Sequence, residues 1–392
     1  MAYAVLLLLA LTNPAGGGEG PLPRWERIPL LLPENLSGAG GFPPVEIPEE
    51  APPSAWPRWE SRSRFLGEDR RVLGEVVQIL PATGETLVRP VLWERRGGGW
   101  KGRWLPGLPR RRLHLEGLGP GGRVFGWAEA GRGRFLPVLI QGKRVDRPLD
   151  DRLPDGWRPR AMAANGLLVG DAPPARGGGA GRLVLLLEGR NGRRDHRLLP
   201  LPGEPRAVTA SGWIAGRTAD GRPFVLGPVL DRGRLRRQEA LEALEPLPWP
   251  GTPPLGGLLA LGEDGRALAE GGPLGGSLFY GEPLLDPSAG LLREAAAVPL
   301  PFRAAGWSRD GWVAGTSGAV AEAGAGNRLE SRGMIWSGGR TESLDARLSG
   351  AREWRILSVA GVDERGWIAA TAARRLEDST ETVVQACLLR PR

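Results

Sequence analysis

Hydrophobic positions along the chain recur in a unit of constant layout. Each copy reads as a strand, a tight turn and a second strand, as in residues 207–216 (AVTASGWIAG) and residues 304–315 (AAGWSRDGWVAG). Asp-Gly dipeptides in two of the turns suit a hairpin that needs positive φ. The small residues that end the copies lie 44 to 55 residues apart, at Gly74, Gly126, Gly170, Gly216, Ala269, Gly315 and Ala370. This spacing is the length of a four-stranded blade.

A third strand follows each copy, and its pattern differs from the first two. It is a continuous apolar run without alternation, which is typical of a strand buried on both faces. Leu-Pro pairs then mark a fourth strand, as in residues 198–202, and helical periodicity is confined to residues 238–245. The apolar runs occupy residues 91–93, 135–139, 183–187, 223–226, 278–280, 334–336 and 386–389.

These strands predict an all-β fold, a seven-bladed β-propeller of four-stranded antiparallel blades. The last copy ends at residue 392 without a fourth strand, whereas residues 27–33 (RIPLLLP) have the missing apolar and proline signature. We therefore expect an N-terminal strand to close the ring, because closure removes exposed sheet edges. Residues 34–58 would span back to the first blade. The blades are expected to begin near residues 61, 114, 160, 206, 256, 303 and 355.

The N-terminal residues divide the chain further. We expect a signal peptide in residues 1–20, the closing strand and a Pro/Gly-rich linker in residues 21–60, and the propeller in residues 61–392. The apolar run at residues 5–11 is too short to span a bilayer and has the length of a signal-peptide core. A buried first strand and a misplaced start codon are the alternatives. Export would make the protein extracellular or periplasmic.

Composition narrows the class of protein. Gly and Pro, 61 and 38 residues, would suggest disorder, but 15 Trp and a 41% hydrophobic content argue for a packed core. The single cysteine, Cys387, excludes a disulfide framework and a multi-thiolate metal site. We expect Cys387 to lie in the core.

The basic charge of the chain is local. The formal net charge is +8, and residues 94–160 alone carry 16 Lys and Arg against 7 Asp and Glu. This excess indicates either attraction to an anionic polymer or membrane surface, or Arg-rich faces that are simply solvated. No segment matches an RNA-binding consensus or a zinc finger, so we expect no specific nucleic-acid recognition.

Signatures of nucleophilic and cofactor chemistry are missing from the sequence. Neither His114 nor His196 is accompanied by a G-x-S-x-G elbow, and both are expected at the surface. Residues 117–122 (GLGPGG) match G-x-G-x-x-G, but a strand rather than a helix follows them, so they predict a hairpin turn. We expect no cofactor and no metal site.

Carboxylate motifs also favour turns over catalysis. Residues 308–312 (SRDGW) are close to the Asp-box of propeller sialidases, but the Gly directly after the Asp and the displaced Trp favour a turn. The pairs Asp150-Asp151 and Glu263-Asp264 fall in predicted turns, where Asp caps the backbone. No catalytic residue is therefore assigned, and the chain is not expected to be an enzyme.

Four arginines form the candidate binding site. Arg160, Arg206 and Arg303 each directly precede the Ala that opens an innermost strand, and Arg355 precedes the same strand in the last copy. Because innermost strands of a propeller begin around one end of the axial channel, these side chains would converge at an anion-binding mouth. The alternative is chance, since Arg is common in this chain.

Residues 332–344 (RGMIWSGGRTESL) and 362–370 (VDERGWIAA) resemble the repeat of the HAF-type extracellular proteins of bacteria. That repeat alternates an N-x-x-G-x-hydrophobic-hydrophobic-G segment with an A-F-L-W-x-x-G segment. Gln385 and Arg332 occupy the slot of the family's His, and its Asn is kept mainly at Asn165. The resemblance implies a secreted, propeller-like protein and adds little about activity.

Two functions remain open at this point. The first is a secreted or periplasmic binding or scaffold module, with an anionic polysaccharide or a protein as its partner. The alternative is a propeller-type hydrolase or lyase that acts on polysaccharide through grouped carboxylates. Three or more carboxylates converging at one channel mouth would favour the enzyme, whereas an aromatic or Arg-lined mouth would favour binding. The oligomeric state is left open.

Overall fold

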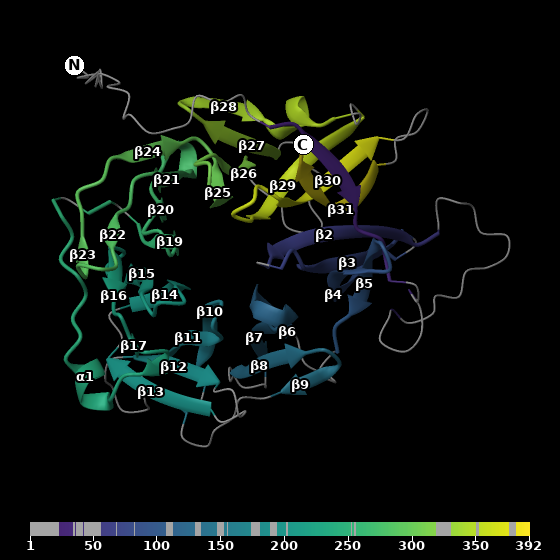
Figure 1. The fold of residues 1–392 in the computed structure, drawn as a ribbon. Coiled ribbons are helices and arrows are strands. Elements are labelled where there is room, and N and C mark those ends of the chain that lie inside the picture. The colour runs from purple at the N-terminus through teal and green to yellow at the C-terminus, as the bar shows by residue number, and fades with distance from the viewer. Residues whose placement is uncertain are drawn as a thin grey trace, which may run out of the picture.

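Seven antiparallel sheets follow one another around a ring in the computed structural model, which is a seven-bladed β-propeller (Figure 1). The first strands of the blades begin within three residues of the expected positions, so the predicted fold and blade order are confirmed. The structure describes residues 23–33, 36, 42, 56–67, 69–81, 83–106, 113–129, 135–146, 153–154, 156–173, 181–188, 194–200, 203–251, 253–254, 256–318, 331–349, 353–375 and 382–392.

The blades are built in chain order, from the innermost strand outward. Blades one to three comprise β2 (Arg58–Leu66), β3 (Val72–Leu80), β4 (Glu85–Arg96), β5 (Gly99–Trp104); β6 (Leu113–Leu118), β7 (Val124–Glu129), β8 (Phe135–Gln141), β9 (Arg144–Asp146); and β10 (Arg158–Met162), β11 (Leu167–Ala172), β12 (Arg182–Glu188), β13 (Arg194–Pro200).

Blades four to seven complete the ring. They comprise β14 (Gly203–Val208), β15 (Ile214–Thr218), β16 (Pro223–Leu226); β19 (Leu258–Leu261), β20 (Ala267–Glu270), β21 (Ser277–Tyr280), β24 (Ala297–Leu300); β25 (Arg303–Trp307), β26 (Val313–Ser317), β27 (Arg332–Ser337), β28 (Arg340–Ser343); and β29 (Trp354–Val362), β30 (Ile368–Arg375), β31 (Thr382–Pro391), β1 (Trp25–Pro29).

Blade four departs from the four-stranded pattern. Its sheet has three strands, and a single bond from the Leu247 N–H to the Val225 carbonyl, 2.8 Å, marks the place of the fourth. Pro246 and Pro248 flank Leu247, and proline cannot donate to a ladder. The chain between β16 and Leu247 forms a hairpin of β17 (Leu230–Asp231) and β18 (Arg234–Leu235), followed by α1 (Gln238–Glu242).

The remaining short elements are insertions and turns. Blade five inserts a hairpin of β22 (Leu285–Asp286) and β23 (Leu291–Leu292), and the single-turn 3₁₀ segments are η2 (Pro120–Gly122), η3 (Pro273–Gly275) and η4 (Leu344–Arg347). No helix in the described part of the chain is long and apolar enough to cross a membrane. The predicted signal peptide lies outside the described residues, and so does most of the predicted linker.

The ring closes as expected, between the two ends of the chain. Strand β1 pairs antiparallel with β31, from Trp25 opposite Pro391 to Pro29 opposite Cys387. Trp25 is fully buried, its Nε1 donates to the Gly366 carbonyl at 3.1 Å, and its ring meets Trp312 of blade six edge-on at 5.3 Å. Closure therefore depends on packing as well as on the ladder.

Third strands pack on both faces, which explains their continuous apolar runs. In β12, Leu183, Val184 and Leu185 are each fully buried. Leu183 and Leu185 join a cluster with blade four, whereas Val184 joins one with Phe125 of blade two. Cys387, on β31, is likewise fully buried, as predicted.

The turn between first and second strand has the same length and closing bond in all seven blades. A backbone bond of 2.7 to 3.0 Å closes each five-residue turn, for example from the Ser308 N–H to the Trp312 carbonyl. The fourth residue has positive φ and is Gly in six blades; in blade one it is Arg70, with φ of 63°. The G-x-G-x-x-G and Asp-box-like segments both run into such turns, so both interpretations as turns are confirmed.

Antiparallel pairing defines two faces of the ring. Turns from first to second and from third to fourth strands lie on one face, here named the hairpin face. Connections from second to third strands and between blades lie on the other, named the loop face. Second strands therefore run from the hairpin face to the loop face.

Candidate binding site at the ring centre

Every innermost strand carries a bulge at the same place. The pairing register skips one residue there, at Arg64, Glu116, Arg160, Arg206, Leu259, Ala305 and Ala360. On the second strand, the residue that pairs with the residue just before the bulge is Gly or Ala. A Cβ on Gly170, which has this position in blade three, would lie 2.1 Å from the Arg158 carbonyl oxygen. Bulges re-aim side chains. In blades one to four, the residue re-aimed at the ring centre is charged.

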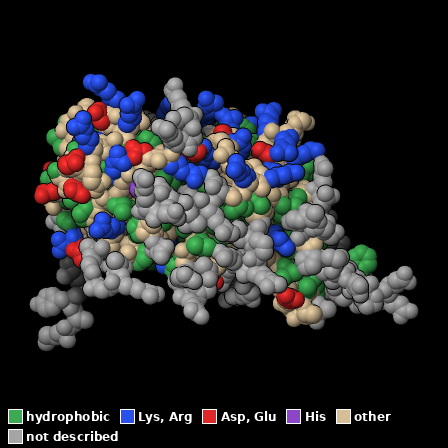
Figure 2. Space-filling view, turned by 90° about the horizontal axis from the view of Figure 1, so that it is seen from below, with side chains coloured by type: hydrophobic (Ala, Val, Ile, Leu, Met, Phe, Trp, Pro, Cys, Tyr) green, Lys and Arg blue, Asp and Glu red, His purple; other side chains and the backbone are tan. Residues whose placement is uncertain are grey.

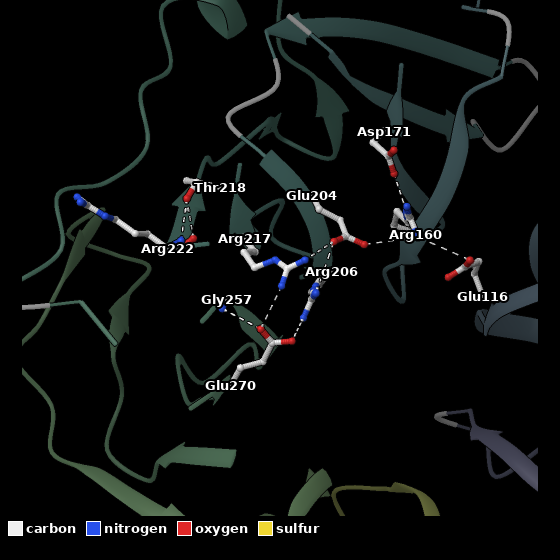
Figure 3. Close-up of polar contacts among 10 residues, drawn as sticks. All are labelled: Glu116, Arg160, Asp171, Glu204, Arg206, Arg217, Thr218, Arg222, Gly257 and Glu270. Atoms are coloured by element: carbon white, nitrogen blue, oxygen red, sulfur yellow. Dashed lines mark hydrogen bonds and ion pairs between the residues drawn. The ribbon is translucent and has the colours of Figure 1, made fainter. Parts of the chain in front are cut away.

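Arginines and carboxylates of blades two to five form one continuous network (Figure 3). Arg160 Nε lies 2.5 Å from Asp171 Oδ1, and its Nη1 lies 3.7 Å from Glu116 Oε1 and 3.5 Å from Glu204 Oε1. Asp171 is the penultimate residue of β11, which ends at the loop face. The network therefore lies on the loop side of the ring centre.

In the second half of the network, arginines also alternate with carboxylates. Arg206 Nη2 lies 3.5 Å from Glu204 Oε2, and its Nη1 lies 2.5 Å from Glu270 Oε1. Arg217 bridges the same two carboxylates, at 3.6 Å from each. Three arginines thus face four carboxylates, Glu116, Asp171, Glu204 and Glu270, so this part of the centre is close to charge balance.

Two pKa shifts follow from this arrangement. Burial alone would raise the pKa of Glu270, but hydrogen bonds from Arg206 and the Gly257 N–H, with the charges of Arg206 and Arg217, lower it below its ordinary value. Burial would lower the pKa of Arg160, yet Asp171, Glu116 and Glu204 raise it. Both groups are held in their charged forms.

The four arginines singled out in the sequence do not share one structural position. Arg160 and Arg206 are the bulge residues of β10 and β14. Arg303, the first residue of β25, precedes its bulge by two residues. Arg355 pairs with Ala373 and precedes Ala360 by five residues, and β29 has an additional bulge at Leu357 between them. An Arg-Ala pair does not fix the register, because the Ala follows the bulge in blades three and four but precedes it in blade six.

The same four arginines also differ in whether a carboxylate compensates their charge. Arg160 and Arg206, 19% and 20% exposed, are enclosed by carboxylates. Arg303 is exposed and has no ion pair within the described residues. Arg355 Nε is buried and has no hydrogen-bond partner in that same part of the chain. Of these four arginines, the two on the innermost strands of blades six and seven therefore lack a carboxylate partner among the described residues, whereas the two on blades three and four have one.

Blade two adds an aromatic stack beside the network. Trp127 Nε1 donates to Glu116 Oε1 at 2.8 Å, and the His114 ring stacks on Trp127 at 3.7 Å between centroids. His114 Nε2 also lies 2.9 Å from Glu129 Oε1. His196 lies on the outermost strand β13. His114 is thus only part-exposed and positions Trp127, a role that the sequence did not indicate.

The predicted turn carboxylates are structural where they are described. Glu263 accepts from Ser211 Oγ at 2.9 Å and from the backbone of the neighbouring blade, and Asp264 Oδ1 accepts from the Arg266 N–H at 3.1 Å. Asp150 and Asp151 lie outside the described residues. Within those residues, no group of three His, Cys, Asp or Glu could hold a metal ion.

Comparison of the chain with models of known protein families finds no match. Comparison with curated proteins finds none either. The resemblance to HAF-type repeats therefore stays a prediction, and the site must be interpreted from its geometry.

Proposed function

We propose that the chain is an exported, non-catalytic binding or scaffold module whose ring centre contacts an anionic ligand. The observation that carries this proposal is that, in the part of the chain that is described, the four carboxylates of the network are paired, whereas two arginines of the innermost strands are not. Glu116, Asp171, Glu204 and Glu270 are all ion-paired, while Arg303 and Arg355 have no carboxylate partner among the described residues. An anionic polysaccharide is the ligand class that suits an exported protein.

Ion-paired carboxylates suit binding better than acid–base catalysis. A general acid must hold a proton near the working pH, which requires a raised pKa. The pKa of Glu270 is instead lowered by its arginine partners. Guanidinium groups without such partners bind carboxylate or phosphate through paired N–H donors, and a buried N–H without an acceptor costs free energy until a ligand supplies one.

A second function has one observation in its favour. Four carboxylates do gather at the ring centre, which is what a propeller hydrolase or lyase of polysaccharides would need. This alternative requires that one of them release its arginine when substrate binds. Cleavage of a polysaccharide by the protein is the outcome that separates the two.

The test changes the open arginines and leaves the enclosed ones intact. We expect Arg303→Gln with Arg355→Gln to elute from an immobilised uronic-acid polymer at lower salt than the unchanged protein, because screened ionic contacts are lost. Arg182→Gln with Arg222→Gln is the matched control. Both residues are exposed on the loop face, where Arg182 begins the third strand β12 and Arg222 directly precedes the third strand β16. Equal retention of the double variant and the unchanged protein would contradict the proposal.

A further inference from the structure

Basic side chains also gather on a second surface, the outer part of the hairpin face. The hairpins between third and fourth strands expose Arg95 and Arg96 in blade one and Lys143 and Arg144 in blade two. The inserted hairpin of blade four exposes two more, Arg232 and Arg234. We name these six residues the basic rim. Figure 2 shows Lys and Arg side chains concentrated along the upper edge of the molecule in that view.

Topology places the whole basic rim on one face. The hairpins of blades one and two are third-to-fourth strand turns, which lie on the hairpin face by definition. The hairpin of blade four leaves β16 at the same face, where the Val229 N–H donates to the Gly212 carbonyl at 2.9 Å. Gly212 belongs to the first-to-second strand turn of that blade, so the hairpin packs directly on a hairpin-face turn.

Most of the basic rim is not neutralised by acidic residues. Arg96 pairs with Glu94, whereas the other five side chains have no ion pair with a described residue. Between residues 94 and 103, 141 and 145, and 230 and 235, the described acidic side chains are Glu94 and Asp231. Glu94 is shared among Arg71, Arg96 and Arg103. The inner turns of the same face are balanced by contrast, as in the pair of Arg309 and Glu364 at 3.3 Å. The excess positive charge therefore lies in the outer hairpins of blades one, two and four.

We propose that the basic rim holds the propeller, hairpin face down, on a bilayer that contains anionic phospholipid. Hairpin tips of several blades end at one face of a disc, so a planar surface contacts them together, and each Lys or Arg near an anionic leaflet adds to binding. A single-stranded polymer is held by aromatic platforms in a groove. The exposed large apolar side chains in the described residues are Leu31, Trp56, Val88, Leu274 and Leu291, and none lies on these hairpins.

The proposal is separate from the ring centre and is tested with vesicles. The unchanged protein should sediment with vesicles of phosphatidylcholine and phosphatidylglycerol at roughly 50 mM salt, but not at roughly 500 mM or with phosphatidylcholine alone. Changing Lys143, Arg144, Arg232 and Arg234 together to Gln should weaken this binding by at least about tenfold. The control changes four exposed arginines of the loop face to Gln: Arg182, Arg222, Arg332 and Arg375.

A charge-preserving variant distinguishes the loss of positive charge from misfolding. Arg144→Lys, Arg232→Lys and Arg234→Lys combined should bind vesicles as the unchanged protein does, because a planar charged surface needs charge rather than guanidinium geometry. The proposal is overturned if the loop-face variant loses as much vesicle binding as the basic-rim variant. It is also overturned if the unchanged protein does not bind anionic vesicles but the basic-rim variant loses retention on a soluble polyanion. That result would assign the surface to a polymer.

Discussion

Glu270 connects the two halves of the ring-centre network. Its carboxylate lies between Arg206 and Arg217 and accepts from the Gly257 N–H at 3.3 Å, so three donors from blades four and five meet on one side chain. These donors lower its pKa in the folded protein below the ordinary value of 4.5. The ionised form of Glu270 therefore contributes to folding.

The pH dependence of this contribution has a defined sign. A carboxyl whose pKa is lowered by folding stabilises the protein above its unfolded pKa, and the effect is lost as the pH falls through the folded pKa. We expect Glu270→Gln to lower the thermal midpoint most near neutral pH, with the difference from the unchanged protein shrinking below about pH 4. Glu245→Gln, at an exposed position after α1, is the control. A difference that stays constant between pH 7 and pH 3 would contradict the assignment.

The turn after each innermost strand is the element that the repeat preserves best. Gly311 has φ of 83°, and a Cβ there would meet no atom within 4 Å, so only backbone conformation opposes a larger residue. We expect Gly311→Ala to lower the free energy of unfolding by about 1 kcal/mol.

Gly99 in β5 provides the matched substitution. A Cβ there would also meet nothing within 4 Å, and its φ is not in the left-handed region. Gly99→Ala should leave the free energy of unfolding unchanged or raise it slightly, because Gly is unfavourable inside a strand. Chemical denaturation measures both variants, and equal effects at the two sites would contradict the turn assignment.

Strand β1 is the element on which ring closure depends. Trp25 is fully buried between blades six and seven, whereas Trp56, just before β2, is 55% exposed. We expect Trp25→Ala to cost about 3–5 kcal/mol of unfolding free energy, and Trp56→Ala less than about 1 kcal/mol. Removing residues 21–34 should lower the thermal midpoint by many degrees. If either change to the closing strand leaves the midpoint unaltered, the ring does not close through β1.

The elements differ in how far the sequence determines them. Third strands such as residues 183–187 could be predicted because burial on both faces leaves an unbroken apolar run. The bulges could not, since a one-residue skip leaves no mark in hydrophobicity and yet decides which side chain turns to the centre. Arg303 was therefore grouped with Arg160 although it lies two residues away in register.

The network partners were missed for a related reason. Glu116 and Arg160 are 44 residues apart, one blade period, and they meet because the bulges of neighbouring blades align. Glu204 also meets Arg160, but it lies two residues before the bulge of β14. A search for opposite charges at the repeat period would have found Glu116 with Arg160, but not Glu204. Glu270 could not be found in this way, because the β17–β18 hairpin and α1 lengthen the connection before it.

At the scale of the whole molecule, charge is distributed differently over the two faces. On the loop side, the ring-centre network of blades two to five is balanced, and Arg303 and Arg355 of the innermost strands β25 and β29 have no ion pair among the described residues. On the hairpin face, the inner turns are balanced and the outer rim is basic. Such a disc can hold one anionic partner at its centre and rest on another by its rim.

Binding without turnover is the central claim, and one measurement addresses both parts. The protein is mixed with a uronic-acid polymer at low salt and analysed by size-exclusion chromatography with light scattering, which reports co-elution and polymer mass together. We expect the protein to co-elute with polymer of unchanged mass, and to separate from it when salt is raised. A falling polymer mass would establish an enzyme, and failure to co-elute at the lowest salt would refute an anion-binding ring centre.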